Sequence, residues 1–92
     1  MQLYAVRIFV HGWEAAVSFY GPTLGLSCAF IHDESGWAEF DVGGARLAVE
    51  RIGFENPDAD VLVGRFVGVS LFVPDVLAEH DRLTRKGVSF VG

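Results

Sequence analysis

The stretches Val6-Arg7-Ile8-Phe9-Val10 and Val69-Ser70-Leu71-Phe72-Val73 decide the fold, because both follow the pattern Val-x-Ile/Leu-Phe-Val. Each is predicted to be a strand with two largely apolar faces, as in strands that are covered on both sides. A turn, an amphipathic helix, a glycine and another strand follow each stretch, with the glycines at Gly25 and Gly87. This order predicts a duplicated β-α-β unit, although two unrelated βα units can also look alike.

The first unit is predicted to hold one helix and four strands. Helical spacing of i, i+3, i+4 and i+7 places one apolar stripe at Trp13, Ala16, Val17 and Tyr20. Gly21-Pro22 is expected to stop this helix, because proline lacks a backbone donor and clashes with the preceding turn. Gly43-Gly44 predicts a two-residue hairpin, since glycine accepts the positive φ of the favoured turns. The strands are predicted over residues 2–10, 26–31, 37–42 and 45–52.

The second unit is predicted to be incomplete. It would consist of a strand over residues 66–73, a helix that Asp75 caps and Gly87 ends, and a last strand over 88–91. It stops near the position equivalent to Ala29, so its sheet would lack two strands and expose an unpaired edge. Three explanations stay open: a longer gene product, a partner chain that supplies the strands, or a natural short form. We expect the first.

The chain is expected to form one domain over residues 1–92, as is usual for a chain of 92 residues. It would divide into a complete βαβββ module over residues 1–52, a linker over 53–65 and a truncated second module over 66–92. The hydrophobic fraction of 51% is high for such a small chain, so every amphipathic element needs cover inside the molecule or against a partner.

Composition excludes several classes of function. The net charge is -5, from 12 acidic and 7 basic residues, and no long basic run is present, so nucleic-acid binding is not expected. No apolar run approaches the roughly 20 residues of a membrane span, and the N-terminus lacks a signal-peptide pattern. Cys28 is the only cysteine and cannot form an intramolecular disulfide, which favours a cytoplasmic protein. We expect Cys28 to lie in the core.

The first unit resembles the βαβββ module of the vicinal oxygen chelate superfamily, which includes glyoxalase I, bleomycin-resistance proteins and extradiol dioxygenases. The resemblance rests on residues 6–10, on Phe19-Tyr20 followed after three residues by Leu24-Gly25-Leu26, and on residues 36–47. The second unit is similar through residues 69–73, Asp75 and 86–88. The resemblance implies an α+β fold with mixed curved sheets, helices on their outer face, and a cleft between paired modules. One fold hosts many activities, so the chemistry stays open.

In metal-dependent members, the ligands lie on the cleft side of the first and last strand of each module. The resemblance transfers those positions to Ala5, Ala48 and Gly68, and the fourth would lie in the missing strands. Alanine and glycine have no side-chain donor for a divalent ion. A slip of one residue would turn the neighbouring side chain to the opposite face, so it would not restore a site. The resemblance therefore implies a metal-free member, or one that has lost the chemistry, and no cofactor is expected.

The neighbours of Ala5 and Ala48 at a period of two are the candidate ligand-binding residues. Arg7 could anchor an anionic ligand, or it could form an internal ion pair with Glu50. The aromatic candidates could line an apolar cleft or fill an interface. No catalytic residue is predicted, and His11, His32 and His80 are expected to have surface or structural roles. The candidates are Arg7, Phe9, Trp37, Glu39, Arg46, Glu50, Ser70 and Phe72.

Three functions follow from these residues and the resemblance. The leading hypothesis is a metal-free protein that binds a small, partly aromatic or anionic molecule, as bleomycin-resistance members bind their drug. The second is a lyase, isomerase or dioxygenase that takes metal ligands from the missing strands or another chain, with Glu39, Glu50 and His32 as the nearest local donors. The third is a non-catalytic domain that dimerises. The expected partners are a small molecule and a second copy of the chain, without nucleic acid or membrane.

Overall fold

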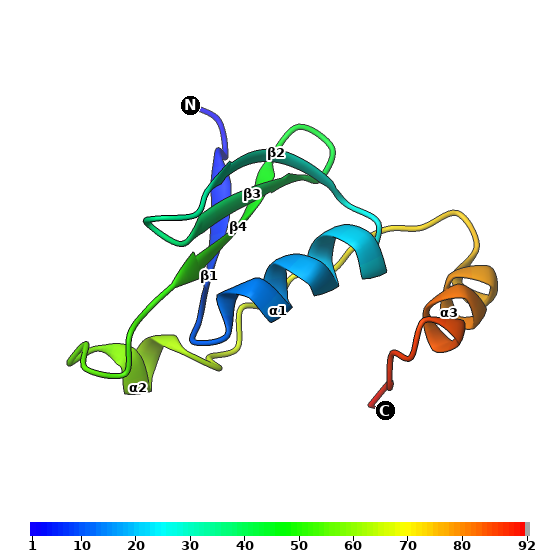
Figure 1. Ribbon diagram of the computed structural model, residues 1–92. Coiled ribbons are helices and arrows are strands. Elements are labelled where there is room, and N and C mark those ends of the chain that lie inside the picture. The colour runs from blue at the N-terminus through cyan, green and yellow to red at the C-terminus, as the bar shows by residue number, and fades with distance from the viewer. Residues whose placement is uncertain (92) are drawn as a thin grey trace.

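The computed structural model describes residues 1–91 and is an α+β fold built on one four-stranded sheet. The elements in chain order are β1 (Ala5–Val10), α1 (Trp13–Ser18), the π-helical turn η1 (Phe19–Thr23), β2 (Ser27–His32), β3 (Trp37–Asp41), β4 (Arg46–Arg51), α2 (Ala59–Leu62) and α3 (Val76–Arg85). The strand order is β1-β4-β3-β2, with β1 parallel to β4 and the other pairs antiparallel (Figure 1). The predicted fold class and the β-α-β-β-β order of the first unit are confirmed.

The hairpin between β3 and β4 fixes the register of the sheet. Gly43 and Gly44 have φ values of 72° and 99°, as the predicted two-residue turn requires. Val42 donates its N–H to the Ala45 carbonyl oxygen over 3.0 Å and closes the turn. The resulting register pairs Glu39 with Ala48 and places both side chains on the same face of the sheet.

The core lies between the sheet and α1. Trp13 is 4% exposed, and its indole N–H donates to the Val49 carbonyl oxygen over 3.1 Å. Phe40 and Val49 are completely buried beneath the helix, as expected for the apolar face of a sheet.

The other face of the sheet is polar. We call it the polar face and define it by three alternating residues on each of β1, β4 and β3, which are Ala5, Arg7 and Phe9; Arg46, Ala48 and Glu50; and Trp37, Glu39 and Asp41.

Gly21-Pro22 does not stop the first helix, contrary to the prediction. The chain continues through η1, with Pro22 inside it. Proline removes one N–H from the ladder, and the chain accommodates the loss with a wider turn in which Leu24 donates to the Phe19 carbonyl oxygen five residues back. The stop falls instead at Gly25, whose φ is 96°.

The predicted strands over residues 66–73 and 88–91 are absent from the described chain. Apolar alternation alone does not make a strand, because a strand needs a neighbouring strand for its backbone hydrogen bonds. The predicted linker contains α2, and only an isolated parallel bridge between Phe9 and Val63 joins that region to β1. Gly92, the last residue of the predicted second module, lies outside the described residues.

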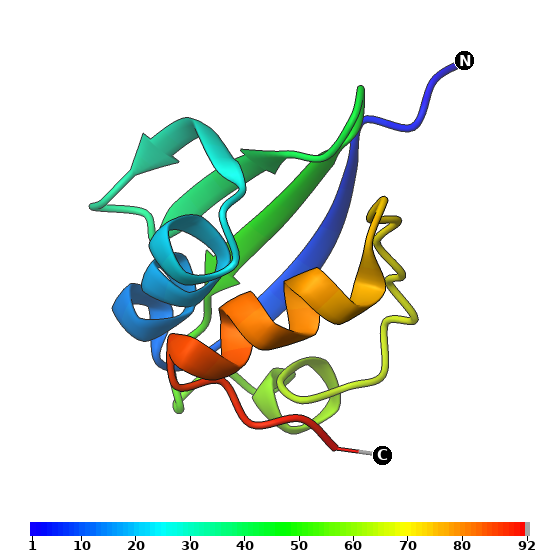
Figure 2. The ribbon, with the colours of Figure 1, turned by 90° about the vertical axis from the view of Figure 1, so that its right-hand side faces the viewer.

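Helix α3 forms where it was predicted. Asp75 accepts a hydrogen bond from the Ala78 N–H over 3.0 Å, and the turn after the helix reaches Gly87 with a φ of 89°. The helix does not lie on the sheet beside α1. Its Arg82 and Lys86 donate to carbonyl oxygens of η1 and the residue after it, so α3 is attached at the end of the first helix (Figures 1 and 2).

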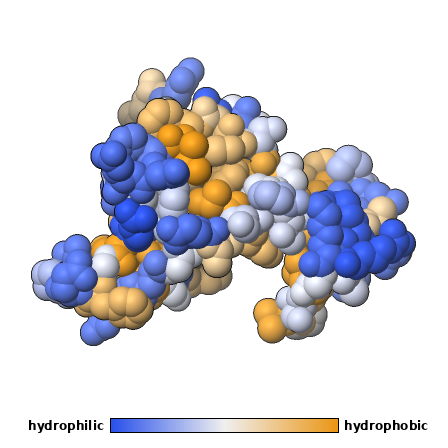
Figure 3. All heavy atoms as spheres, viewed as in Figure 1, coloured by the Kyte–Doolittle hydropathy of each residue, from blue (hydrophilic) through white to orange (hydrophobic). Residues whose placement is uncertain are grey.

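Cys28 is exposed, contrary to the predicted core position. It lies on β2, which is an edge strand, and every residue of β2 is exposed. The cover that α1 gives to the central strands does not extend to this edge. Hydrophobic residues therefore reach the surface over the sheet and again near α3 (Figure 3). None of the helices within residues 1–91 combines the length and the apolar character needed to cross a membrane.

Candidate functional site

The polar face brings together six of the eight predicted ligand-binding residues. The strand register arranges its side chains in three rows, each running across the sheet from β1 to β2. The rows are Ala5, Arg46, Asp41 and Ser27; Arg7, Ala48, Glu39 and Phe30; and Phe9, Glu50, Trp37 and His32. Small residues lie near the middle of this face, charged residues lie around them, and aromatic residues lie at one end.

Arg7 stands at the aromatic end of the face. Its Nη2 and Nε atoms donate to Oε1 of Glu50 over 2.5 and 3.2 Å, so the ion pair expected as one alternative is present. The guanidinium carbon also lies 5.1 Å from the centre of the Phe9 ring and 5.6 Å from that of Trp37. These distances are within the range of cation–π contacts. The Arg7 side chain stays 52% exposed, so a ligand could reach both the cation and the rings.

Glu39 is the buried acid of the face. Its carboxylate accepts hydrogen bonds from the Tyr4 hydroxyl over 2.6 Å and from the Trp37 indole N–H over 2.7 Å. Arg46 lies 3.7 Å from the same carboxylate and 3.3 Å from Asp41. The hydrogen bond from Tyr4, then that from Trp37, lower the pKa of Glu39 against the opposing effect of burial. The same bond raises the pKa of Tyr4. Glu39 therefore fixes the Trp37 indole in place.

Acid is expected to destabilise the chain through Glu39. A carboxyl with a lowered folded-state pKa contributes stability above the unfolded-state pKa of about 4.3, and this contribution is lost as the pH falls through the folded-state value. Urea unfolding followed from neutral to acid pH measures the effect. The matched control is Glu39→Gln, which cannot titrate and should show a shallower loss of stability in acid. Identical pH profiles for the two proteins would show that Glu39 does not contribute.

Tyr4 is a residue of the site that the sequence did not indicate. It precedes β1, and its partner Glu39 lies on a strand that is not adjacent to β1 in the sheet. Only the register of the whole sheet brings the two together. The alternation of Trp37 and Glu39 on one face was visible in the sequence and is confirmed.

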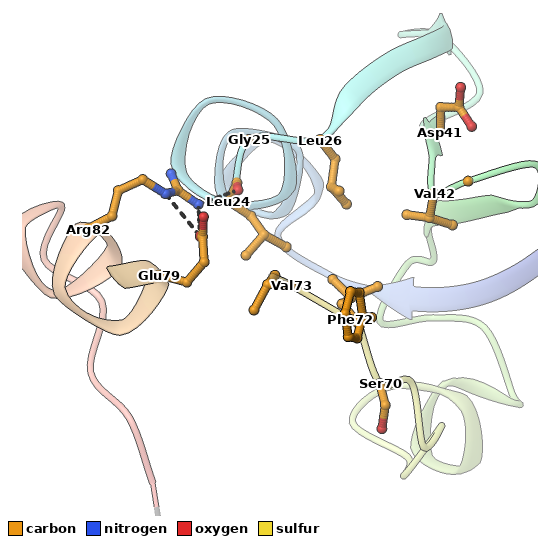
Figure 4. A pocket seen from close by; sticks show the side chains of 12 residues that line it. Leu24, Gly25, Leu26, Asp41, Val42, Ser70, Phe72, Val73, Glu79 and Arg82 are labelled. Atoms are coloured by element: carbon orange, nitrogen blue, oxygen red, sulfur yellow. Dashed lines mark hydrogen bonds and ion pairs between the residues drawn. The ribbon is translucent and has the colours of Figure 1, made fainter. Parts of the chain in front are cut away.

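Ser70 and Phe72 lie away from the polar face. They line a cavity of about 760 Å³ between the residues that follow η1, the β3–β4 hairpin and α3 (Figure 4). Leu24, Leu26 and Val42 form apolar walls of this cavity, which opens on the side of the sheet that α1 covers. At one end, Arg82 is held by Glu79 over 2.6 Å and by the Leu24 carbonyl oxygen over 2.8 Å. Its charge is thus already satisfied.

The three histidines make local contacts. His11 Nδ1 hydrogen-bonds to the Ile52 carbonyl oxygen over 2.8 Å, and His32 Nδ1 lies 2.8 Å from the Ser35 hydroxyl in the β2–β3 turn. His80 stacks on Phe90 with ring centres 4.4 Å apart. The His32–Ser35 contact belongs to the exposed turn, where the Ser35 N–H also donates to His32 Nδ1 over 3.3 Å, and none of these contacts joins a histidine to a second histidine or to an acid, so they favour structural roles.

Comparison with known proteins assigns the fold to a family. The model of the Glyoxalase/Bleomycin resistance protein/Dioxygenase superfamily matches residues 2–92 of the sequence. The chain belongs to this superfamily. The family suggested by the Phe19-Tyr20 and Leu24-Gly25-Leu26 stretches is thereby confirmed.

Several bacterial and environmental proteins are similar to this superfamily member. The uncharacterized protein YraH of Bacillus subtilis (strain 168) is 27% identical over 95 residues, which span 96% of the chain and 74% of YraH. A superfamily member from Sphaerobacter thermophilus DSM 20745 superimposes with a TM-score of 0.77 at 25% identity, over 100% of this chain and 76% of the other. The integron cassette protein HFX_CASS4, from the mobile metagenome of Halifax Harbour Sewage Outfall, shares the fold with a TM-score of 0.73 at 19% identity, over 99% and 75%.

The metal positions that the superfamily resemblance implies do not supply ligands in this chain. Ala5 and Ala48 lie on the polar face as expected, and neither side chain has a donor atom. His32 and Glu50 lie on either side of Trp37 in one row, so the indole separates them, and Glu50 is already paired with Arg7. Within residues 1–91, no three His, Cys, Asp or Glu side chains cluster to form a metal site.

Proposed function

We propose that this superfamily member binds a small, partly aromatic or anionic molecule on the polar face, without a divalent metal. The observation that supports the proposal is the position of Arg7 over the rings of Phe9 and Trp37. In the sheet, Arg7 pairs with Ala48, the position at which a metal-dependent member would have a ligand. A half-exposed cation between two aromatic rings offers stacking and hydrogen-bonding groups at one place.

The charges of the polar face favour the aromatic character of the ligand over its anionic character. Arg7 is paired with Glu50, and Arg46 is paired with Asp41 and Glu39. An anion would have to compete with Glu50 for Arg7, and it would approach a face that has more carboxylates than guanidinium groups. A planar ring needs only to stack on Trp37, whose indole is already fixed by Glu39. We therefore expect planar aromatic compounds to bind best, with a carboxylate of secondary importance.

Trp37→Ala is expected to weaken the binding of a planar aromatic compound about fivefold, because stacking on one ring is worth roughly 1 kcal/mol beyond the area buried. A thermal-shift screen of benzoate, naphthoate and their uncharged amides identifies the probe, and titration calorimetry measures the loss of affinity. Trp37→Phe is the matched control, since it keeps a ring at this position. Each variant is compared with its own melting temperature without ligand.

Two results would contradict the proposal in different ways. If none of the aromatic or anionic compounds raised the melting temperature, the polar face would not be a binding site for such molecules. If Arg7→Ala bound an aryl carboxylate as tightly as the original chain, the face could still bind rings, but Arg7 would have no anchoring role.

A second candidate function is that of a dimerising interaction domain. The observation that favours it is the exposure of large apolar side chains outside the sheet, including Phe66 and Phe72, which are each 92% exposed. Side chains of this size are costly to leave in water and mark interaction surfaces when they gather. No comparable observation among residues 1–91 favours a metal-dependent enzyme. The carboxylates of Glu39 and Glu50, which could act as metal ligands, already accept hydrogen bonds from Tyr4, Trp37 and Arg7.

A further inference from the structure

The ion pair between Arg7 and Glu50 uses only part of the hydrogen-bonding capacity of its two groups. A guanidinium group carries five N–H donors, and a carboxylate has two acceptor oxygens. Nε and Nη2 of Arg7 both donate to the same oxygen, Oε1 of Glu50. Among the described residues 1–91, no hydrogen bond engages Nη1 of Arg7 or Oε2 of Glu50. The pair thus keeps a cationic donor and an anionic acceptor beside each other.

Both unused groups lie at the aromatic end of the polar face. The register places Glu50 opposite Phe9 on one side and opposite Trp37 on the other. The guanidinium carbon of Arg7 lies over both rings. The side chains of Arg7 and Glu50 are 52% and 26% exposed, so a ligand can reach them. A flat molecule stacked on the Trp37 indole can therefore direct one edge toward this ion pair.

Glu39, the other acid in the middle of the face, has no such capacity. Its Oε1 accepts a hydrogen bond from the Tyr4 hydroxyl, and its Oε2 accepts one from the Trp37 indole N–H. Glu39 therefore holds the ring on which a ligand would stack, and Glu50 is the carboxylate that can recognise the edge of that ligand. Groups that are already fixed in this way cost little to order on binding.

The opposite charges of the two unused groups favour a neutral ligand edge. A ligand carboxylate that accepted from Arg7 Nη1 would bring its negative charge against Glu50, and a ligand ammonium group on Glu50 Oε2 would bring its positive charge against Arg7. A neutral edge with one acceptor beside one donor satisfies both groups and leaves the ion pair intact. Each of the two hydrogen bonds would involve a charged group, and such bonds are stronger than those between neutral groups.

We propose that the ligand of the polar face is a planar compound with a cyclic amide, or lactam, along one edge. Its carbonyl oxygen accepts from Arg7 Nη1, and its N–H donates to Glu50 Oε2. A lactam has this acceptor and this donor on adjacent ring atoms, and fusion to an aromatic ring keeps it flat for stacking on Trp37. The inference rests on the proposed function, because it names the class of ligand for the same site.

A series of fused-ring compounds of similar size tests the proposal by titration calorimetry with the full chain. The compound 2-quinolone has the lactam edge, and N-methyl-2-quinolone lacks its donor. Quinoline lacks both the N–H and the carbonyl, so it controls for the added volume of the methyl group, and 2-naphthoate has a carboxylate instead. We expect 2-quinolone to bind about tenfold more tightly than each of the others, because a lost hydrogen bond to a charged group typically costs this much.

Glu50→Gln tests the acceptor in the protein itself. The amide oxygen of glutamine can accept from Arg7, so its amide nitrogen would replace Oε2 and face the N–H of the lactam. The preference for 2-quinolone over N-methyl-2-quinolone should then fall to about twofold or less. Because Arg7 would lose its anionic partner, 2-naphthoate should bind roughly tenfold more tightly than it does to the original chain.

Glu14→Gln is the matched control for this variant. It removes the same charge from a side chain that is 80% exposed and belongs to α1, on the other side of the sheet. It should change none of the affinities in the series. An equal gain in 2-naphthoate affinity in both variants would show that the net charge of the chain, and not the release of Arg7 from Glu50, controls anion binding.

The outcomes separate this inference from the proposed function. If 2-quinolone, N-methyl-2-quinolone and quinoline bound equally, the face would still bind rings, but the lactam edge would play no part and the inference would be overturned. Tighter binding of 2-naphthoate than of 2-quinolone to the original chain would also overturn it, because the anion would then displace Glu50 from Arg7. An unchanged preference in Glu50→Gln would exclude Glu50 as the acceptor. A chain that binds no compound of the series would overturn both proposals.

Discussion

Trp13→Ala is expected to lower the free energy of unfolding by about 3–5 kcal/mol, the cost typical of removing a buried aromatic side chain. Trp13, the first residue of α1, is 4% exposed and packs in the same core cluster as the buried residues Phe40 and Val49. Its removal leaves a cavity and also deprives the Val49 carbonyl oxygen of its indole donor. A small domain has little stability to spare, so the loss would leave much of the protein unfolded.

Urea unfolding followed by near-ultraviolet circular dichroism measures this cost. Trp13→Phe is the matched control, because it keeps most of the apolar ring and loses only the hydrogen bond. We expect about 1–2 kcal/mol for the control, the sum of a lost hydrogen bond and a small cavity. If alanine and phenylalanine at this position cost the same, the indole would not fill the core as described.

Glu39→Ala is expected to lower the free energy of unfolding by about 1–2 kcal/mol, because the half-buried Trp37 indole N–H loses its acceptor, whereas the hydroxyl of the exposed Tyr4 can turn to water. The substitution removes the only acceptor that the described residues provide for the Tyr4 hydroxyl and the Trp37 indole N–H. It also leaves Arg46 with Asp41 alone. Trp37 would then lose its fixed orientation, so the binding of planar compounds should weaken together with stability.

A double-mutant cycle separates the contribution of Tyr4 from the rest of the network. Tyr4→Phe removes the hydroxyl and keeps the ring, and its effect should be small when Glu39 is already alanine. Glu39→Gln should fall between the original chain and Glu39→Ala, because the amide oxygen can accept one of the two hydrogen bonds. Additive effects of the two single substitutions would show that Tyr4 and Glu39 do not act together.

The first unit could be predicted from the sequence because its signals are local. Alternation over residues 37–42 and the two glycines of the hairpin depend on neighbours in the chain, and the structure has a strand and a turn there. Pro22 was misjudged because its effect depends on whether the chain can widen into a π-turn, which the residue type alone does not reveal. Cys28 was misjudged because α1 is too short to cover the edge strand.

The second unit could not be predicted in the same way. The repeat placed Ser70 and Phe72 on a sheet by analogy with Arg7 and Phe9, and the structure has no strand at residues 66–73. A helix such as α3 satisfies its own backbone, so it forms from local signals alone, whereas a strand depends on partners distant in sequence. The same reason explains why Tyr4 was missed, since its contact with Glu39 depends on the register of three strands.

Ala48 has an evolutionary consequence. It is completely buried in the middle of the polar face, with Arg7 and Glu39 on either side in its row. A histidine or glutamate at this position would have to fit into space that is already filled, and overpacking of this kind typically costs about 1–3 kcal/mol. One substitution at Ala48 would therefore add a possible metal donor only with a loss of stability. Room for the new side chain would require a smaller residue at a neighbour such as Arg7, and that change would remove the cation from this face.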